Sequence, residues 1–253
     1  MLYVYGVVRA GQPSPDVTGV GSPAGDVRLV ESGPLAAAVS ELPDDIALQD
    51  EDARAHLRVL IRLLDDGPVI PLRMGTVAPD DDVVRAEVLD AVRDEMAARL
   101  AALDGLVELH VDADDDETEA IAEVARGAGL DGRAATDFGS RLELGEEIAE
   151  LLIERRRRLA EQIMARLRPH AVQDTPRAVL QGPEDSVLRW AFLVKRDDLE
   201  AFDDAVVDVR SAYPSITVRY VGPLPASHFV DWQRTTQSEP VTDNFSAQGS
   251  WGW

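Results

Sequence analysis

Cysteine is absent from the sequence, and lysine occurs once, at Lys195. Without cysteine the chain forms neither a disulfide nor a thiolate metal site, which is typical of a cytoplasmic protein. Basic side chains are scarce as well, because 25 basic residues stand against 47 acidic ones for a formal charge of −22. Nucleic acids and anionic membrane surfaces bind a concentrated positive surface, so the composition disfavours both as partners.

Long hydrophobic runs are also missing. No uninterrupted apolar stretch approaches the roughly 18 residues of a membrane helix, and no basic segment precedes the short apolar run at the N-terminus. We therefore expect no membrane span, no secretion signal and a cytoplasmic location. The 253 residues are 45% hydrophobic, which suffices for one large domain or two ordinary domains with packed cores.

Motifs of common catalytic and cofactor sites are not found. No serine stands in a GxSxG elbow, no lysine stands in a phosphate loop, and the glycines near residue 20 miss the dinucleotide spacing. The histidines are too far apart in sequence for a local metal motif, and we interpret each as structural or exposed: His56, His110, His170 and His228. We predict no catalytic residue, no cofactor and no metal.

An acidic run begins at Asp112 and places carboxylates at the first, third, fifth and twelfth positions of a calcium loop. Glu117 stands where that loop requires glycine, so we interpret the run as a solvated acidic linker. The basic cluster at residues 155–158 is surrounded by glutamates on a predicted helix. We interpret it as a solvated face with intrahelical ion pairs rather than as an anion site.

Residues 1–112 show strand and helix patterns in alternation, which predicts an N-terminal α+β domain of the ferredoxin-like sort. The chain then turns polar and glycine-rich, and we predict a linker with a short helix at residues 113–140. The predicted elements of the N-terminal domain are strands at residues 3–9, 27–31, 35–40, 69–77 and 106–111, with helices at 50–65 and 81–103.

Residues 141–232 predict a second, C-terminal α+β domain, a small ferredoxin-like unit with a long helix at residues 142–168. Pro169 ends this helix. Residues 233–253 predict a polar tail that carries Trp251 and Trp253. The further elements of this domain are strands near residues 178–181, 187–195 and 216–221, and a helix at residues 199–213.

Two separate motifs stand out, the run VIPLRMGTV at residues 69–77 and the run GPLPASHFV at residues 222–230. The first resembles the Leu-Pro-Leu-Arg-Phe-Gly-Thr run of the gas vesicle protein F/L family, with Ile70 and Met74 as conservative replacements. The second is similar to the closing glycine-proline turn and phenylalanine-valine pair of that family. The family more often has proline-tyrosine-serine where this chain has Ala226, Ser227 and His228.

The resemblance implies a non-enzymatic, minor structural or assembly protein of gas vesicle formation. It also implies association with gas vesicles and a small hydrophobic partner, the gas vesicle shell protein, with other accessory gas vesicle proteins as further candidate partners. The alternative is an enzyme or a small-ligand-binding protein, because the ferredoxin-like fold carries many unrelated activities. That alternative requires a pocket.

The candidate partner-binding residues fall into three groups. Tyr3 and Tyr5 belong to the first sheet, of which we expect one apolar face to remain open to a partner. The other groups come from the two motifs, and the tail tryptophans are a competing site. The motif candidates are Arg73, Gly75, Thr76, Gly222, Pro223 and Phe229, where Arg73 makes either a structural ion pair or a partner contact and Gly75 adopts a conformation that favours glycine.

Overall fold

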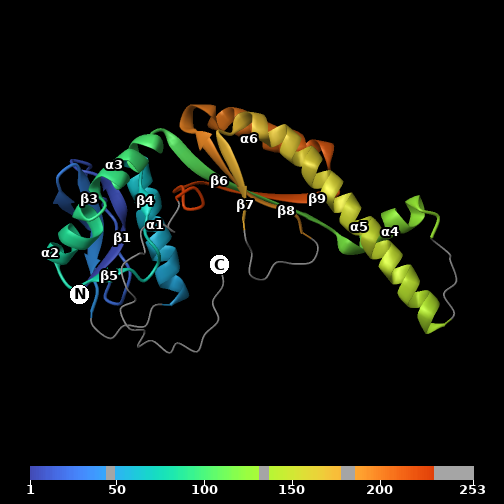
Figure 1. Cartoon of the computed structure of the whole chain (residues 1–253), viewed down its shortest axis with the longest axis horizontal. Helices are drawn as coiled ribbons and strands as arrows, with labels where there is room; N and C mark the ends of the chain where they lie inside the picture. Colours follow the sequence, from blue (N-terminus) through green and yellow to red (C-terminus); the bar gives the residue numbers. More distant parts are fainter. Residues whose placement is uncertain (44–48, 131–136, 178–185, 231–253) are drawn as a thin grey trace. The chain divides into compact units, whose positions relative to one another are not determined.

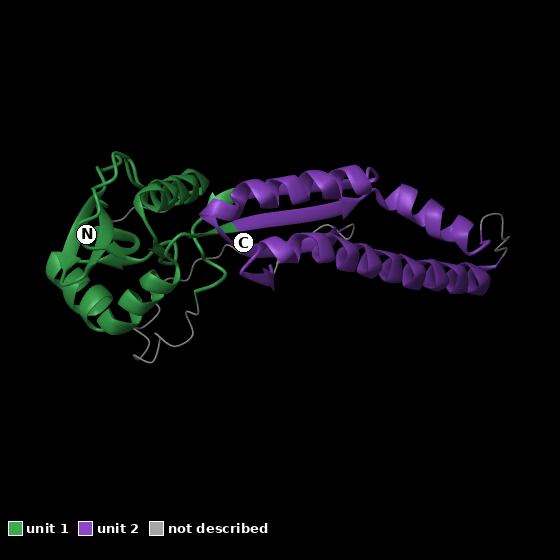
Figure 2. Cartoon of the chain, turned by 90° about the horizontal axis from the view of Figure 1, so that it is seen from above, with its two compact units in different colours: residues 1–108, 222–247 green, residues 109–221, 248–253 purple. Residues whose placement is uncertain are grey.

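The computed structural model describes residues 1–43, 49–130, 137–177 and 186–230. These residues form two compact units, one of residues 1–108 and 222–230 and one of residues 109–221 (Figures 1 and 2). Each unit combines helices with an antiparallel sheet, which confirms the predicted α+β class. The predicted strand at residues 178–181 and the polar tail lie outside the described residues. None of the described helices has the length and apolar character of a membrane span.

The sheet of the first unit is built around β1 at its centre. Its order is β2-β3-β1-β4, and β5 also pairs with β1. The predicted strands at residues 27–31 and 35–40 form a hairpin, since β2 and β3 pair antiparallel from Ser32 opposite Leu35. The strands are β1 (Leu2–Arg9), β2 (Arg28–Ser32), β3 (Leu35–Glu41), β4 (Ile70–Pro71) and β5 (Val77–Ala78).

The helices α1 and α2 of the first unit begin at capped, acidic termini. α1 (Asp50–Asp66) starts where the Gln49 backbone N–H donates to the Asp52 carboxylate at 2.8 Å. The predicted helix at residues 81–103 is divided into three pieces, α2 (Asp81–Val83), the π-helix η1 (Val84–Asp90) and α3 (Arg93–Ala102).

Both faces of the first sheet are covered. In β1 every residue from Leu2 to Val8 is buried, and in β3 so is every residue from Leu35 to Ser40, although successive side chains point to opposite faces. α1 contacts β1, α3 contacts β1 and β3, and η1 contacts β2 and β3. The expectation of an open apolar face on this sheet is therefore wrong.

The second unit has the order β-α-β-β-α-β through β6, α5, β7, β8, α6 and β9, with α4 inserted after β6. Its sheet order, β7-β8-β6-β9, is that of the ferredoxin-like arrangement. The elements are β6 (Leu106–Asp115), α4 (Glu117–Gly127), α5 (Phe138–Leu167), β7 (Gln173–Pro176), β8 (Ser186–Lys195), α6 (Leu199–Ala212) and β9 (Ile216–Leu224), with 3-10 turns η2 (Arg168–His170) and η3 (Arg196–Asp198).

Two predictions about the middle of the chain are wrong. β6 does not close the first sheet, because it lies between β8 and β9 in the second. The supposed linker at residues 113–140 begins inside β6 and continues as α4. The first unit also departs from the ferredoxin-like order, since three strands precede its first helix.

The core of the second unit lies between its sheet and the helices α5 and α6. Ile163 and Leu167 of α5 are fully buried, and Phe192 of β8 packs edge-on against Phe202 of α6 with ring centres 5.2 Å apart. The N-terminal half of α5 contacts α4 instead of the sheet (Figures 1 and 2).

Candidate functional site: an anchored surface turn

The first family-like motif forms a turn between β4 and β5, which we call the motif turn (residues 72–77). Both flanking strands pair with β1, at Gly6 opposite Pro71 and at Tyr3 opposite Val77. Inside the turn, the Leu72 N–H donates to the Tyr5 carbonyl at 2.8 Å and the Val4 N–H donates to the Thr76 carbonyl at 2.9 Å. The backbone of β1 therefore fixes the turn at both ends.

A buried chain of polar groups anchors the tip of the motif turn from below. The Gly75 N–H donates to Tyr3 Oη at 3.0 Å, and Tyr3 Oη lies 2.9 Å from His56 Nδ1. The direction of this second bond follows the His56 tautomer: Nδ1 accepts from the Tyr3 hydroxyl when the other ring nitrogen carries the proton. A hydrogen bond between His56 and the Leu72 backbone then ties α1 to the start of the turn.

Tyr5 extends the same anchor toward the loop before β2. Its hydroxyl accepts from the Val20 N–H at 2.8 Å and bonds to Ser40 Oγ at 2.8 Å, while its ring stacks on His56 with centres 5.6 Å apart. Tyr3 and Tyr5 are fully buried. They hold the motif turn in place, and their side chains are not part of the surface.

The outer side of the motif turn is exposed. Arg73 lies on the surface, and the exposed fractions are 37% for Met74 and 47% for Val77. Thr76 Oγ1 donates to the Arg73 carbonyl at 2.7 Å, which closes the turn. Within the described residues Arg73 has no ion-pair partner, so the structure does not provide the structural pair that was one of its two expected roles.

Gly75 has a φ of 89°, which confirms the expected left-handed conformation. We predict that Gly75→Val lowers the free energy of unfolding by about 1 to 3 kcal/mol, because a β-branched residue is strained at this φ. Denaturant unfolding measures the effect. Gly75→Asn is the matched control, since asparagine tolerates this conformation, and an equal loss for both variants would show that φ is not the cause.

His56 predicts a pH dependence of stability. Burial lowers the pKa of His56 to about 4, against the opposing effect of the Leu72 backbone bond. In the unfolded chain the His56 ring takes up a proton near pH 6.5, so acidification below that pH lowers the free energy of unfolding. The stabilisation that the neutral, buried ring provides is lost completely below about pH 4. We expect His56 to account for about 2 kcal/mol of lost unfolding free energy between pH 7 and pH 5.

The measurement compares denaturant unfolding of the parent and of His56→Gln at both pH values. The variant lacks the ring that titrates. Both proteins have the same carboxylates, so the pH effects of the carboxylates cancel when the two stabilities are subtracted. Equal pH dependence in the two proteins would contradict the assignment.

The second family-like motif begins in the last residues of β9 and continues beyond it, and within the first unit Glu108 holds it. Glu108 is fully buried; its Oε2 accepts from the His228 N–H at 2.9 Å and its Oε1 lies 2.6 Å from His228 Nδ1. Gly222 and Pro223 are exposed, whereas Phe229 is half-buried. Glu108 was not among the residues singled out from the sequence; its signal was a carboxylate between the apolar residues Val107 and Leu109.

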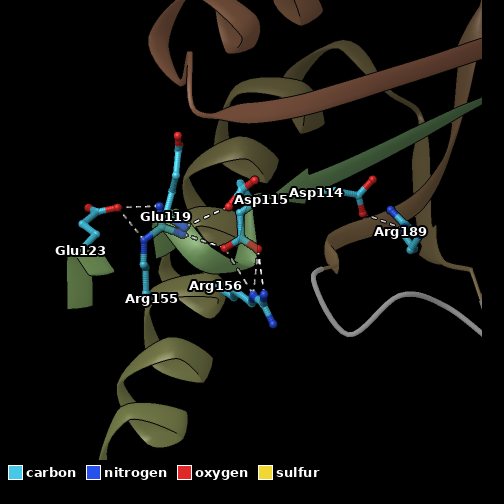
Figure 3. A network of polar contacts seen from close by, with 8 residues as sticks. Asp114, Asp115, Glu119, Glu123, Arg155, Arg156 and Arg189 are labelled. Atoms are coloured by element: carbon cyan, nitrogen blue, oxygen red, sulfur yellow. Dashed lines mark hydrogen bonds and ion pairs between the residues drawn. The ribbon is translucent and has the colours of Figure 1, made fainter. Parts of the chain in front are cut away.

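The first part of the acidic run is not a solvated linker, because Asp114 and Asp115 are buried in ion pairs of the second unit (Figure 3). The later carboxylates are exposed at the start of α4. Asp115 pairs with Arg155 Nη1 and Arg156 Nη2, each at 2.8 Å. Asp114 points to the opposite face of β6 and pairs with Arg189 Nη2 at 2.6 Å and with Arg219. Of the carboxylates that the calcium-loop spacing singled out, Asp112, Asp114 and Glu123 pair with arginines, and Asp116 caps α4.

The arginine cluster of α5 is thus divided by burial. Arg155 and Arg156 are 13% and 14% exposed, which contradicts the predicted solvated face. Arg157 and Arg158 pair with Glu154 on the surface, as expected.

Comparison with known proteins places this geometry in a family. A sequence profile described as gas vesicle synthesis protein GvpL/GvpF matches residues 1–231. Gas vesicle protein F of Streptomyces sp. (strain CB03234) is 35% identical over 90% of this chain and 99% of its own length. Gas vesicle protein F1 of Halobacterium salinarum is 26% identical over 91% of this chain and 92% of its own length.

Solved structures agree in fold. The crystal structure of GvpF from Anabaena sp. PCC7120 superposes with a TM-score of 0.74 at 21% identity, over 90% of this chain and 94% of that one. The crystal structure of GvpF from Microcystis aeruginosa superposes with a TM-score of 0.73 at 16% identity, over 90% of this chain and 98% of that one. With both motifs in place and a family profile that spans nearly the whole sequence, the chain belongs to the gas vesicle GvpL/GvpF family.

Proposed function

We propose that this protein is a non-catalytic, cytoplasmic assembly component of gas vesicle formation that binds the hydrophobic gas vesicle shell protein through the motif turn. The observation that carries the proposal is the exposed Arg73, Met74 and Val77 on a turn anchored by buried Tyr3 and His56. Other accessory gas vesicle proteins are further candidate partners.

The motif turn has the physical properties of a recognition site. A turn that is already fixed loses little conformational entropy when it binds, so more of the contact energy appears as affinity. Arginine is over-represented among binding hot spots, and Met74 adds an adaptable apolar side chain beside it. β4 and β5 also lie at an edge of the first sheet, where an extended segment of a partner finds unpaired backbone groups.

A pull-down with purified shell protein tests the proposed contact. We expect the double variant Arg73→Glu with Met74→Ser to reduce binding by about tenfold or more, because a charge of the wrong sign replaces the proposed anchor. Arg58→Glu is the matched control, since Arg58 is exposed on α1 and undergoes the same charge change. Equal binding by both variants would remove the motif turn from the proposal.

Truncation tests the competing site in the tail. We expect removal of residues 233–253 to leave shell-protein binding intact. Loss of binding on tail removal alone would transfer the site to the segment that carries Trp251 and Trp253.

The alternative of a small-ligand-binding protein or enzyme has less support. An open hollow of about 310 Å³ in the first unit is lined by Asp80, Asp81 and Asp82, and its lining arginine, Arg28, already pairs with Asp81 at 2.7 Å. Ligand pockets are typically enclosed and largely apolar, with a few convergent polar groups.

A further inference from the structure

One face of α5 continues past the sheet of the second unit, and none of the described residues covers it there. In the C-terminal half of the helix this face packs into the core through Ile163, Met164 and Leu167. Counted back from Leu167 in steps of seven or four residues, the same face of the helix passes through Ala160 and then through apolar residues in the N-terminal half. We call the latter the α5 stripe: Phe138, Leu142, Ala149 and Ile153.

The α5 stripe is apolar and exposed. The exposed fractions are 75% for Phe138, 52% for Leu142 and 68% for Ile153. α4 packs against a neighbouring face, where Leu152 is buried and Arg155 Nη2 reaches Glu123 at 2.7 Å, and it leaves the stripe uncovered. From Phe138 to Ile153 the stripe is about 22 Å long, or roughly four helical turns.

Acidic side chains border the α5 stripe. Glu146 and Glu150 are exposed, and by helical spacing they lie beside Leu142, Ala149 and Ile153. Among the described residues neither has an ion-pair partner. Farther along the helix, Arg157 is already neutralised by Glu154 and Glu161. Exposed Arg141 lies on the other border near Phe138, so the two glutamates leave a net negative charge beside the stripe.

We propose that the α5 stripe is a docking surface for an amphipathic helix of another protein, about four turns long, with lysine or arginine beside its apolar seam. A second copy of this chain is disfavoured as the occupant, because each copy has a formal charge of −22 and brings its own glutamates to the same border. The proposal is independent of the contact between the motif turn and the shell protein.

Two synthetic peptides of about 18 residues test the proposal, with the same leucine seam and either lysines or glutamates beside it. Fluorescence anisotropy measures their binding to the full-length protein. We expect the lysine peptide to bind about fivefold more tightly than the glutamate peptide. Leu142→Ser with Ile153→Ser should weaken that binding about tenfold, whereas Val207→Ser, at an exposed position of α6, should not change it.

A charge reversal on the protein separates docking from non-specific attraction. Glu146→Lys with Glu150→Lys should invert the preference, so that the glutamate peptide binds more tightly. Equal binding of both peptides, an unaltered preference after charge reversal, or unchanged binding by the serine variant would each overturn the proposal. So would dimerisation of the protein through Leu142 and Ile153 in light scattering, because the occupant would then be a second copy.

Discussion

Replacing Asp115 with asparagine is expected to lower the free energy of unfolding by about 3 to 5 kcal/mol. The Asp115 side chain is 2% exposed and bonds two guanidinium groups, Arg155 through Nη1 at 2.8 Å and Arg156 through Nη2 at 2.8 Å (Figure 3). Asparagine keeps the size of the side chain but removes its charge, which leaves two largely buried arginines without their shared counter-charge.

Denaturant unfolding of the full chain measures this effect. Glu154→Gln is the matched control on α5, because Glu154 pairs with Arg157 and Arg158 on the surface, where solvent screens the interaction. We expect the control to leave the unfolding midpoint nearly unchanged. Equal shifts of the unfolding midpoint for Asp115→Asn and Glu154→Gln would show that burial does not make the Asp115 ion pairs more stabilising than surface pairs.

The second large effect is expected for Ile163→Asp, at about 3 to 5 kcal/mol. Ile163 is fully buried where α5 packs into the core of the second unit, so the variant removes an apolar contact and buries a carboxylate without a partner. Leu152→Asp, at an 8% exposed position beside α4, should cost about 2 to 4 kcal/mol by the same mechanism.

The control for these variants is Ile153→Asp. Ile153 is adjacent to Leu152 in the sequence, yet 68% of it is exposed, so we expect a change within about 0.5 kcal/mol. Thermal or denaturant unfolding distinguishes the three. Similar losses of unfolding free energy for Leu152→Asp and Ile153→Asp would mean that the exposed face of α5 is covered in solution.

Local elements were predictable from the sequence because they depend on local patterns. The apolar spacing of α1 and α5 and the turn residues between β2 and β3 identify these elements within a few positions. The left-handed conformation of Gly75 was predictable for the same reason, since a glycine between two short strands marks a turn.

Sheet membership was not predictable in this way. The alternation of β6 shows that it is a strand but carries no information about which sheet it joins, and here its partners are β8 and β9. The acidic run was misinterpreted because its counter-charges, Arg155, Arg156 and Arg189, lie at least 40 residues away along the chain. Pairing over such a separation is a property of the tertiary fold.

The interior position of Tyr3 and Tyr5 also depends on tertiary structure. An alternating strand indicates two faces, but whether a helix covers the second face depends on the course of the chain after it. Here both faces of β1 and β3 are buried, and α1, η1 and α3 all contact the sheet. The sequence therefore identified the motif turn as a candidate site but assigned the tyrosines to its surface instead of its anchor.

The most direct test of the proposed function is gas vesicle formation in a host strain whose own copy of the gene is deleted. Electron microscopy should show absent or malformed vesicles in the deletion strain without a metabolic defect. Complementation with the parent gene and with Arg58→Glu should restore the vesicles, while Arg73→Glu with Met74→Ser should not, although that variant unfolds at the parent's denaturant midpoint. Normal vesicles in the deletion strain, or full rescue by the motif-turn variant, would contradict the account.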